Sequence, residues 1–142
     1  MALNKASLDK LKGVHPDLVR VIKRASEDGK ADFIVVEGLR TLERQKELKK
    51  AGATKILNSR HITGHAVDVV PLVDGKPRWD WSLYLPLAER IRAAAIKEKV
   101  PIRWGGNWSS LNDIKGKITS SMLSKSFPDG PHFELPRVKP YL

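Results

Sequence analysis

The stretch NSRHITGHAVDVVP, residues 58–71, places histidine and aspartate side chains directly beside a run of apolar β-formers. From Ala66 onward the residue types predict a strand, and Pro71 is expected to end that strand or move it to a sheet edge. Side chains alternate between the two faces of a strand, so Ala66, Asp68 and Val70 share one face. A carboxylate buried without a partner is costly, and Asp68 therefore needs a counter-charge.

His61 is the preferred partner for that carboxylate. Gly64 allows a bend before the strand, and this bend can return the His61 imidazole towards Asp68. His65 points to the other face by strand parity, although a bulge at Gly64 would reverse that parity. His132, at the start of the later segment HFELP, offers a third ligand. Two imidazoles and one carboxylate leave the fourth tetrahedral position of a zinc ion to water, which is the arrangement of a catalytic site.

Two further residues complete a hydrolytic hypothesis. Asp129 lies in the turn Pro-Asp-Gly just before His132. It could take a proton from zinc-activated water and pass it to the leaving amine. Arg40 follows the segment FIVVEGL and could stabilise an oxyanion or hold a substrate carboxylate. The alternative for Arg40 is a surface ion pair with Glu37 or Glu43.

The rest of the chain predicts alternating helices and strands. Helices are predicted over 15–29, over 40–52 with Thr41 as a cap, and over 82–99 with Pro86 near the first turn. Strands are predicted over 32–38, 66–73, 101–106 and 132–136, with an Asp-Gly turn at 74–75 and a loop with one short helical piece over 107–128. These elements predict a single α+β domain, residues 1–142, with a small, mostly antiparallel sheet and helices packed on one side.

Composition restricts the function classes. The chain has 142 residues, no cysteine and a formal net charge of +10. Disulfide frameworks and thiolate metal sites are excluded, and the charge favours an anionic partner such as nucleic acid, a membrane surface or a wall polymer. There is no apolar run long enough to cross a membrane and no apolar core of a signal peptide. We expect a soluble monomer that is cytosolic when made.

The combined motif resembles a known family. The pattern S-x-H-x-x-G-x-A-x-D at 59–68, joined to D-x-x-H at 129–132, is similar to zinc peptidases of the D-alanyl-D-alanine carboxypeptidase and dipeptidase group, which includes VanY-like enzymes. Within that group the chain most resembles bacteriophage endolysins that act as L-alanyl-D-glutamate endopeptidases. The segments VVEGLRTLERQ, RWGGNW and DGPHFEL occur in the family's order. The related carboxypeptidases have Glu where this chain has Asp129, which favours the endolysin branch.

The resemblance implies a role for each matching residue. It implies that His61, Asp68 and His132 bind one Zn²⁺, that Asp129 is the catalytic acid/base, that Arg40 stabilises the transition state, and that Ser59 and Gln45 lie close to the bound peptide. Trp104 and Trp108 flank the sequence GGN and could line a groove, although tryptophans are more often core or cleft wall. Glu134 shares strand parity with His132 and could orient this ligand, or it could be exposed.

The leading hypothesis is therefore an endolysin that cleaves the L-Ala-D-Glu bond of the peptidoglycan stem peptide. Such a protein is made in the host cytoplasm without a signal peptide and reaches the wall after the membrane has been opened. Its positive charge would attract it to anionic envelope polymers. One alternative is a D-alanyl-D-alanine carboxypeptidase or dipeptidase with the same metal. The other is a cationic wall-binding module without turnover; no nucleic-acid-binding signature is present.

Overall fold

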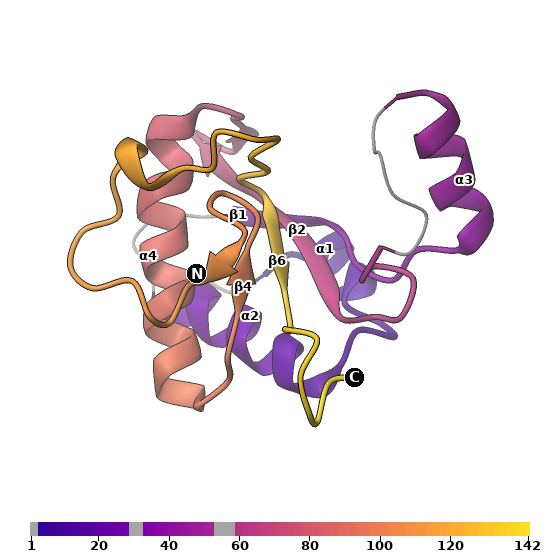
Figure 1. The fold of residues 1–142 in the computed structure, drawn as a ribbon, viewed down its shortest axis with the longest axis horizontal. Coiled ribbons are helices and arrows are strands. Elements are labelled where there is room, and N and C mark those ends of the chain that lie inside the picture. Colours follow the sequence, from indigo (N-terminus) through magenta and orange to yellow (C-terminus); the bar gives the residue numbers. More distant parts are fainter. Residues whose placement is uncertain (1–2, 29–32, 53–58) are drawn as a thin grey trace.

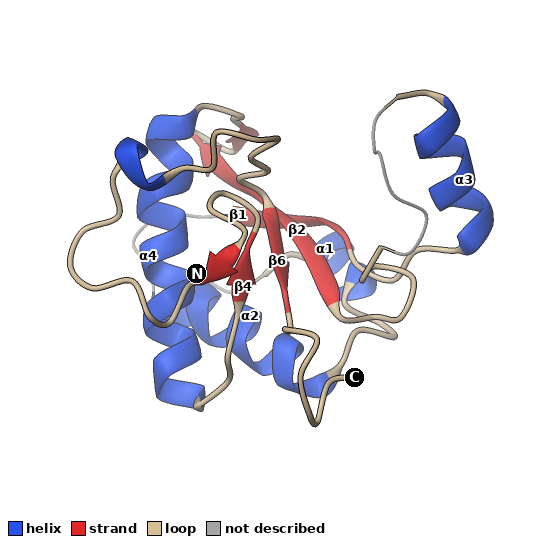
Figure 2. Cartoon of the chain, in the orientation of Figure 1, coloured by secondary structure: helices blue, strands red, loops and turns tan. Residues whose placement is uncertain are grey.

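A computed structural model describes residues 3–28, 33–52 and 59–142 and shows an antiparallel sheet with helices around it (Figures 1 and 2). The strands are β1 (Phe33–Glu37), β2 (Ala66–Val73), β3 (Lys76–Pro77), β4 (Arg103–Trp104), β5 (Ser109–Ser110) and β6 (His132–Glu134). The helices are α1 (Lys5–Lys10), α2 (Pro16–Asp28), α3 (Leu42–Lys50) and α4 (Trp81–Glu98), with a short 3-10 helix at Ser120–Met122. The sheet order is β1-β2-β6-β4-β5, with β3 paired to β2, and every pairing is antiparallel. The predicted α+β class is confirmed.

The helices largely follow their sequence signals. The helix predicted over 15–29 is α2, and its expected last residue, Gly29, lies outside the described residues. Thr41 caps α3 as predicted, because its side chain accepts a hydrogen bond from the Arg44 backbone N–H at 3.1 Å.

In α4, Pro86 lies inside the helix, in its second turn. α1 was not predicted, although Asn4 caps it by accepting from the backbone N–H of Ser7 at 2.8 Å.

The strand at the centre of the sheet differs from its prediction at Pro71. This proline does not end β2, which continues to Val73, and its carbonyl accepts from the Arg78 N–H at 3.0 Å. β6 pairs only with Ala66 to Asp68 of β2. Pro71 lies beyond that pairing. Its lack of a backbone N–H therefore does not remove a hydrogen bond between β2 and β6. β4 is shorter than the predicted strand over 101–106, and the predicted loop over 107–128 also contains β5.

The two faces of the sheet have different partners. Val67 and Val69 of β2 belong to the apolar core, together with Phe133 of β6 and residues of α2 and α4. α2 and α4 pack against each other, and α4 contacts β2. Asp68 and His132 lie on the opposite face because side chains alternate along a strand. α3 lies at the end of the molecule away from α4 (Figure 1).

Among the described residues, no helix combines the length and the apolar character needed to span a bilayer.

Arg60 joins the segment before β2 to the C-terminal tail. Its buried guanidinium donates to the carbonyl oxygens of Leu135 at 3.1 Å, Pro136 at 3.2 Å and Tyr141 at 2.7 Å. The His65 carbonyl accepts from the Leu135 N–H at 2.8 Å, beside the same contact. The turn that carries His61 is thereby fixed to the end of the chain.

Replacing Arg60 with alanine should therefore destabilise the fold. Three carbonyl groups, two of them in buried hydrogen bonds, would lose their donor, and we expect a loss of about 2–3 kcal/mol in the free energy of unfolding, or roughly 5–10 °C in Tm. Thermal unfolding followed by circular dichroism measures this change. Lys139→Ala, an exposed change in the same tail, should leave the Tm within about 1 °C. Equal Tm values for the two variants would contradict the anchoring role.

Candidate metal centre

Strand register brings the predicted ligands together. Asp68 on β2 lies directly opposite His132 on β6, and His61 lies on the turn before β2. The Asp68 Oδ1 atom is 3.2 Å from His61 Nε2 and 3.4 Å from His132 Nδ1. These three donor atoms lie within 4.8 Å of one another, and both histidines are buried. The three residues form a group that could hold a metal ion.

Each imidazole is oriented by its second nitrogen. His61 Nδ1 lies 2.9 Å from the Gly38 carbonyl oxygen, which only accepts, so this nitrogen carries the proton and Nε2 faces Asp68. His132 Nε2 lies 2.6 Å from Glu134 Oε1, and its Nδ1 faces Asp68. Supporting contacts of this kind fix the ring and tautomer of metal-ligating histidines. The donor set of two nitrogens and one oxygen suits zinc.

Charges inside the group favour a cation. Burial opposes ionisation of Asp68, but hydrogen bonds with His132 and His61 hold its pKa well below the usual range. Burial also opposes the charged form of His132, yet hydrogen bonds with Asp68 and Glu134 raise its pKa to about 9. The carboxylates of Asp68 and Glu134 thus face the two ring nitrogens of His132 and favour a positive charge there. A metal ion bound to Nδ1 would take the place of that positive charge.

Asp129 lies just before β6, close enough to the group for the charges of Asp68, His132 and His61 to act on its carboxyl. Its backbone N–H donates to the Gly105 carbonyl at 2.8 Å, and its own carbonyl accepts from the His132 N–H at 3.2 Å. A Cβ atom at Gly105 would lie 2.3 Å from the Asp129 carbonyl oxygen, so the close approach requires glycine. Burial and the charge of Asp68 raise the pKa of the Asp129 carboxyl. A carboxyl with a raised pKa beside a metal group is suited to general acid/base chemistry.

Arg40 is buried beside the metal group and is not a surface residue. Its Nε donates to Glu37 Oε1 at 2.5 Å, its Nη1 donates to Gln45 Oε1 at 2.6 Å, and its Nη2 lies 3.8 Å from Asp68 Oδ2. The expected ion pair with Glu37 forms, but it forms inside the site. Gln45 is wholly buried, so it has no surface to offer a peptide and instead holds Arg40 in place.

The remaining predicted contacts divide between the core and the edge of the site. Ser59 is buried, and its Oγ accepts from the His61 N–H at 3.2 Å. Trp104 is fully buried and stacks on Phe133, so the expectation that it lines a groove is wrong. Trp108 is half-buried, and its ring centre lies 5.3 Å from that of His132.

His65 takes no part in the group. Its Nδ1 atom lies 2.7 Å from the Thr63 hydroxyl, and its ring packs near His15. The parity argument therefore selected the correct histidine of the two for proximity to Asp68.

Some residues of the site carried no sequence signal. The Tyr84 hydroxyl is buried without a hydrogen-bond partner in the described part of the chain. Burial and the charges of Asp129 and Asp68 raise its pKa to about 12. In the sequence, Tyr84 cannot be distinguished from the other residues on the buried face of α4. Gly38 was also missed, since a glycine after a strand more often indicates a turn than a ligand support.

The comparisons with known proteins identify the family of the chain. The family described as phage L-alanyl-D-glutamate peptidase matches residues 1–136. The chain belongs to this family of peptidases, as the sequence resemblance predicted. It is 32% identical over 136 residues to the L-alanyl-D-glutamate peptidase of Escherichia phage T5, covering 92% of this chain and 95% of that protein.

Two other proteins extend the comparison. The L-alanyl-D-glutamate peptidase of Listeria phage A118 is 30% identical over 108 residues, which is 76% of this chain but 37% of that longer protein. The crystal structure of the Serratia marcescens L-Ala D-Glu endopeptidase ChiX superimposes with a TM-score of 0.77 at 41% identity. That match covers 94% of this chain and 90% of the other. The fold is therefore shared with a solved endopeptidase.

Metal affinity should depend on Glu134. Glu134→Gln keeps the size of the side chain but removes the charge that faces His132 Nε2, and we expect Zn²⁺ affinity to fall about 10–100-fold. Competition with a chromophoric chelator measures this affinity directly. Glu43→Gln, an exposed change on α3, should bind zinc like the unchanged protein. Equal affinities of the two variants would show that Glu134 does not support the ligand.

Proposed function

We propose that the chain is a zinc-dependent endopeptidase that cleaves the L-Ala-D-Glu bond of the peptidoglycan stem peptide. The observation that carries this proposal is the group His61, Asp68 and His132, held by Gly38 and Glu134 in a chain of this peptidase family. The phage T5 relative and ChiX carry the same bond specificity in their names.

The donor atoms for one zinc ion per chain would be His61 Nε2, Asp68 Oδ1 and His132 Nδ1. Zinc supplies a Lewis acid at this position and lowers the pKa of water towards neutrality. Three protein ligands leave a coordination position for solvent or substrate, as in catalytic zinc sites.

Asp129 moves the proton in this proposal. One of its carboxylate oxygens accepts the proton of the attacking water and then donates it to the nitrogen of the leaving D-glutamate. The raised pKa of Asp129 suits both steps, because a carboxyl that is too acidic returns the proton poorly. Its place on the turn fixed by Gly105 keeps the carboxyl near the zinc ligands.

Arg40 stabilises the negative charge that develops on the scissile carbonyl oxygen. Glu37 and Gln45 hold its Nε and Nη1, so the guanidinium is oriented before the substrate arrives. Ser59 supports the backbone of His61, and Trp108 offers a half-exposed ring beside His132 for contact with the peptide. Gln45 does not contact the substrate in this proposal, and its role is to orient Arg40.

The proposal also covers the oligomeric state of the protein and the place where it acts. We propose that the 142 residues act as one monomeric domain, made in the host cytoplasm and active on the wall after membrane permeabilisation. The net charge of +10 attracts the protein to anionic envelope polymers, and this attraction weakens as salt is added.

Digestion of purified cell walls tests the cleaved bond. We expect new free amino groups on D-glutamate, identified by derivatising the new termini and analysing them by mass spectrometry. EDTA should stop the reaction, and added Zn²⁺ should restore it. Release of D-alanine instead would assign a carboxypeptidase, and wall binding without any new terminus would assign a binding module.

The proton-transfer and ligand roles can be separated by two variants. Asp129→Ala should retain zinc but lose at least about 100-fold in kcat, because the general acid/base is removed. His132→Ala should lose both zinc and turnover. Metal content by mass spectrometry and wall clearing by turbidity measure the two effects. A metal-free Asp129→Ala protein would show that Asp129 is a ligand and not the base.

A further inference from the structure

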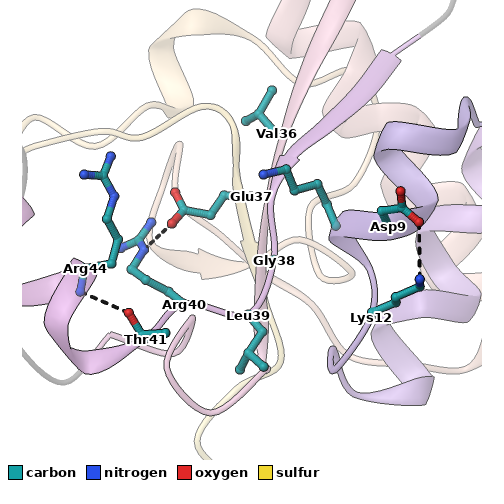
Figure 3. Close-up of a pocket in the computed structure, with 10 residues that line it drawn as sticks. Asp9, Lys12, Val36, Glu37, Gly38, Leu39, Arg40, Thr41 and Arg44 are labelled. Carbon is teal, nitrogen blue, oxygen red and sulfur yellow. Dashed lines mark hydrogen bonds and ion pairs between the residues drawn. The ribbon is translucent and has the colours of Figure 1, made fainter.

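A groove lies next to the metal group, between α1, the end of β1 and the start of α3. Its volume is about 510 Å³. The lining residues are Asp9, Lys10, Lys12, Val36, Glu37, Gly38, Leu39, Arg40, Thr41 and Arg44. Apolar side chains therefore lie beside several cationic ones, and Figure 3 shows these residues on the two sides of the β1–α3 connection.

The groove shares structure with the site. Arg40 lines it and also approaches Asp68 Oδ2 at 3.8 Å. Gly38 lines it as well, and the Gly38 carbonyl holds the His61 ring at 2.9 Å. The groove and the metal group are therefore neighbouring sites that share Arg40 and Gly38.

The cations of the groove are not equally available to a ligand. Arg40 is committed to Glu37 and Gln45, while Lys10 and Lys12 line the groove from the α1 side, where Lys12 lies 3.4 Å from Asp9. Arg44 extends on the same side of the connection as Arg40 and Glu37 (Figure 3).

The Arg44 side chain is 57% exposed, and its Nη1 lies 3.4 Å from Oε2 of the exposed Glu47. Exposed pairs of this kind contribute little, so a substrate carboxylate can replace Glu47 at small cost. The Arg44 backbone is fixed by the Thr41 cap, which leaves the guanidinium beside the groove.

The chemistry of the substrate supplies a matching anion. Glutamate has two carboxyl groups, and only one can form the next peptide bond. The residue on the leaving side of an L-Ala-D-Glu bond therefore carries a second carboxyl group that is ionised at neutral pH unless it is amidated. A planar guanidinium is the side chain best suited to pair with it.

We propose that this groove binds the glutamate side of the substrate, with Arg44 pairing with the free carboxylate of D-glutamate. This inference rests on the proposed function. Arg44 thereby makes the enzyme select walls whose D-glutamate is unmodified over walls in which that carboxylate is an amide. Leu39, which is 51% exposed in the groove, offers the apolar contact beside it.

Two synthetic stem peptides test the proposal, one with the free carboxylate of D-glutamate and one with the amide in its place. The zinc-loaded protein is assayed on both, and the ratio of the two kcat/KM values is the readout. We expect the unchanged protein to prefer the carboxylate, and Arg44→Gln to reduce this preference about tenfold. Arg44→Lys, which keeps the charge, should retain part of it.

Lys46→Gln is the matched control, since it removes one exposed positive charge from the same helix at a position that does not line the groove. It should show the preference of the unchanged protein. An equal preference in Arg44→Gln and the unchanged protein, or no preference in the unchanged protein, would overturn the proposal for Arg44 and leave the function intact. Failure to cleave either peptide would overturn the proposed function and this inference with it.

Discussion

The antiparallel register between β2 and β6 is the constraint on which the site depends. It sets Asp68 opposite His132 on one face and Val67 opposite Phe133 on the other, where both are fully buried in the core. A slip of β6 by one residue would turn Phe133 out of the core and His132 into it. The packing that stabilises the sheet therefore also fixes two of the three donor atoms. His61 is added by a turn that Arg60 anchors to the C-terminal tail.

Sequence reasoning succeeded where a local rule decided the outcome. Alternation along β2 correctly placed Asp68 on the face opposite Val67 and Val69, and the same rule placed His65 away from Asp68. Sequence reasoning failed where the position of a side chain depended on which strands pair with each other. Trp104 pairs with Phe133 across β4 and β6, and this register alone sends its ring into the core. The hydrogen bond from His61 to Gly38 likewise joins segments that only the pairing of β1 with β2 brings together. The six-residue helix α1 is too short for periodicity to show.

Several buried charges of the site are paired with one another. Arg40 contacts Glu37 and Gln45 and approaches Asp68, while Glu134 contacts His132 and lies 3.6 Å from Arg103. Such pairs contribute little net stability, because removing the charges from water opposes their attraction. Removal of one partner leaves the other buried and uncompensated. This network is therefore better explained as a device for holding donor atoms and a guanidinium in fixed positions than as a source of stability.

In the proposed mechanism, the residues that would hold the metal and those that would contact the substrate come from different parts of the fold. Two of the donor atoms belong to the paired strands β2 and β6, and the third belongs to His61 on the turn that precedes β2. Asp129 lies on a turn, Trp108 on the segment after β4, and Arg44 on α3, all outside the strands. Loops and helix ends can change in sequence without altering the register that positions the ligands. In this proposal, a metal centre built mainly on paired strands, with substrate contacts on loops and on a helix start, would allow the same hydrolytic chemistry to act on different peptides.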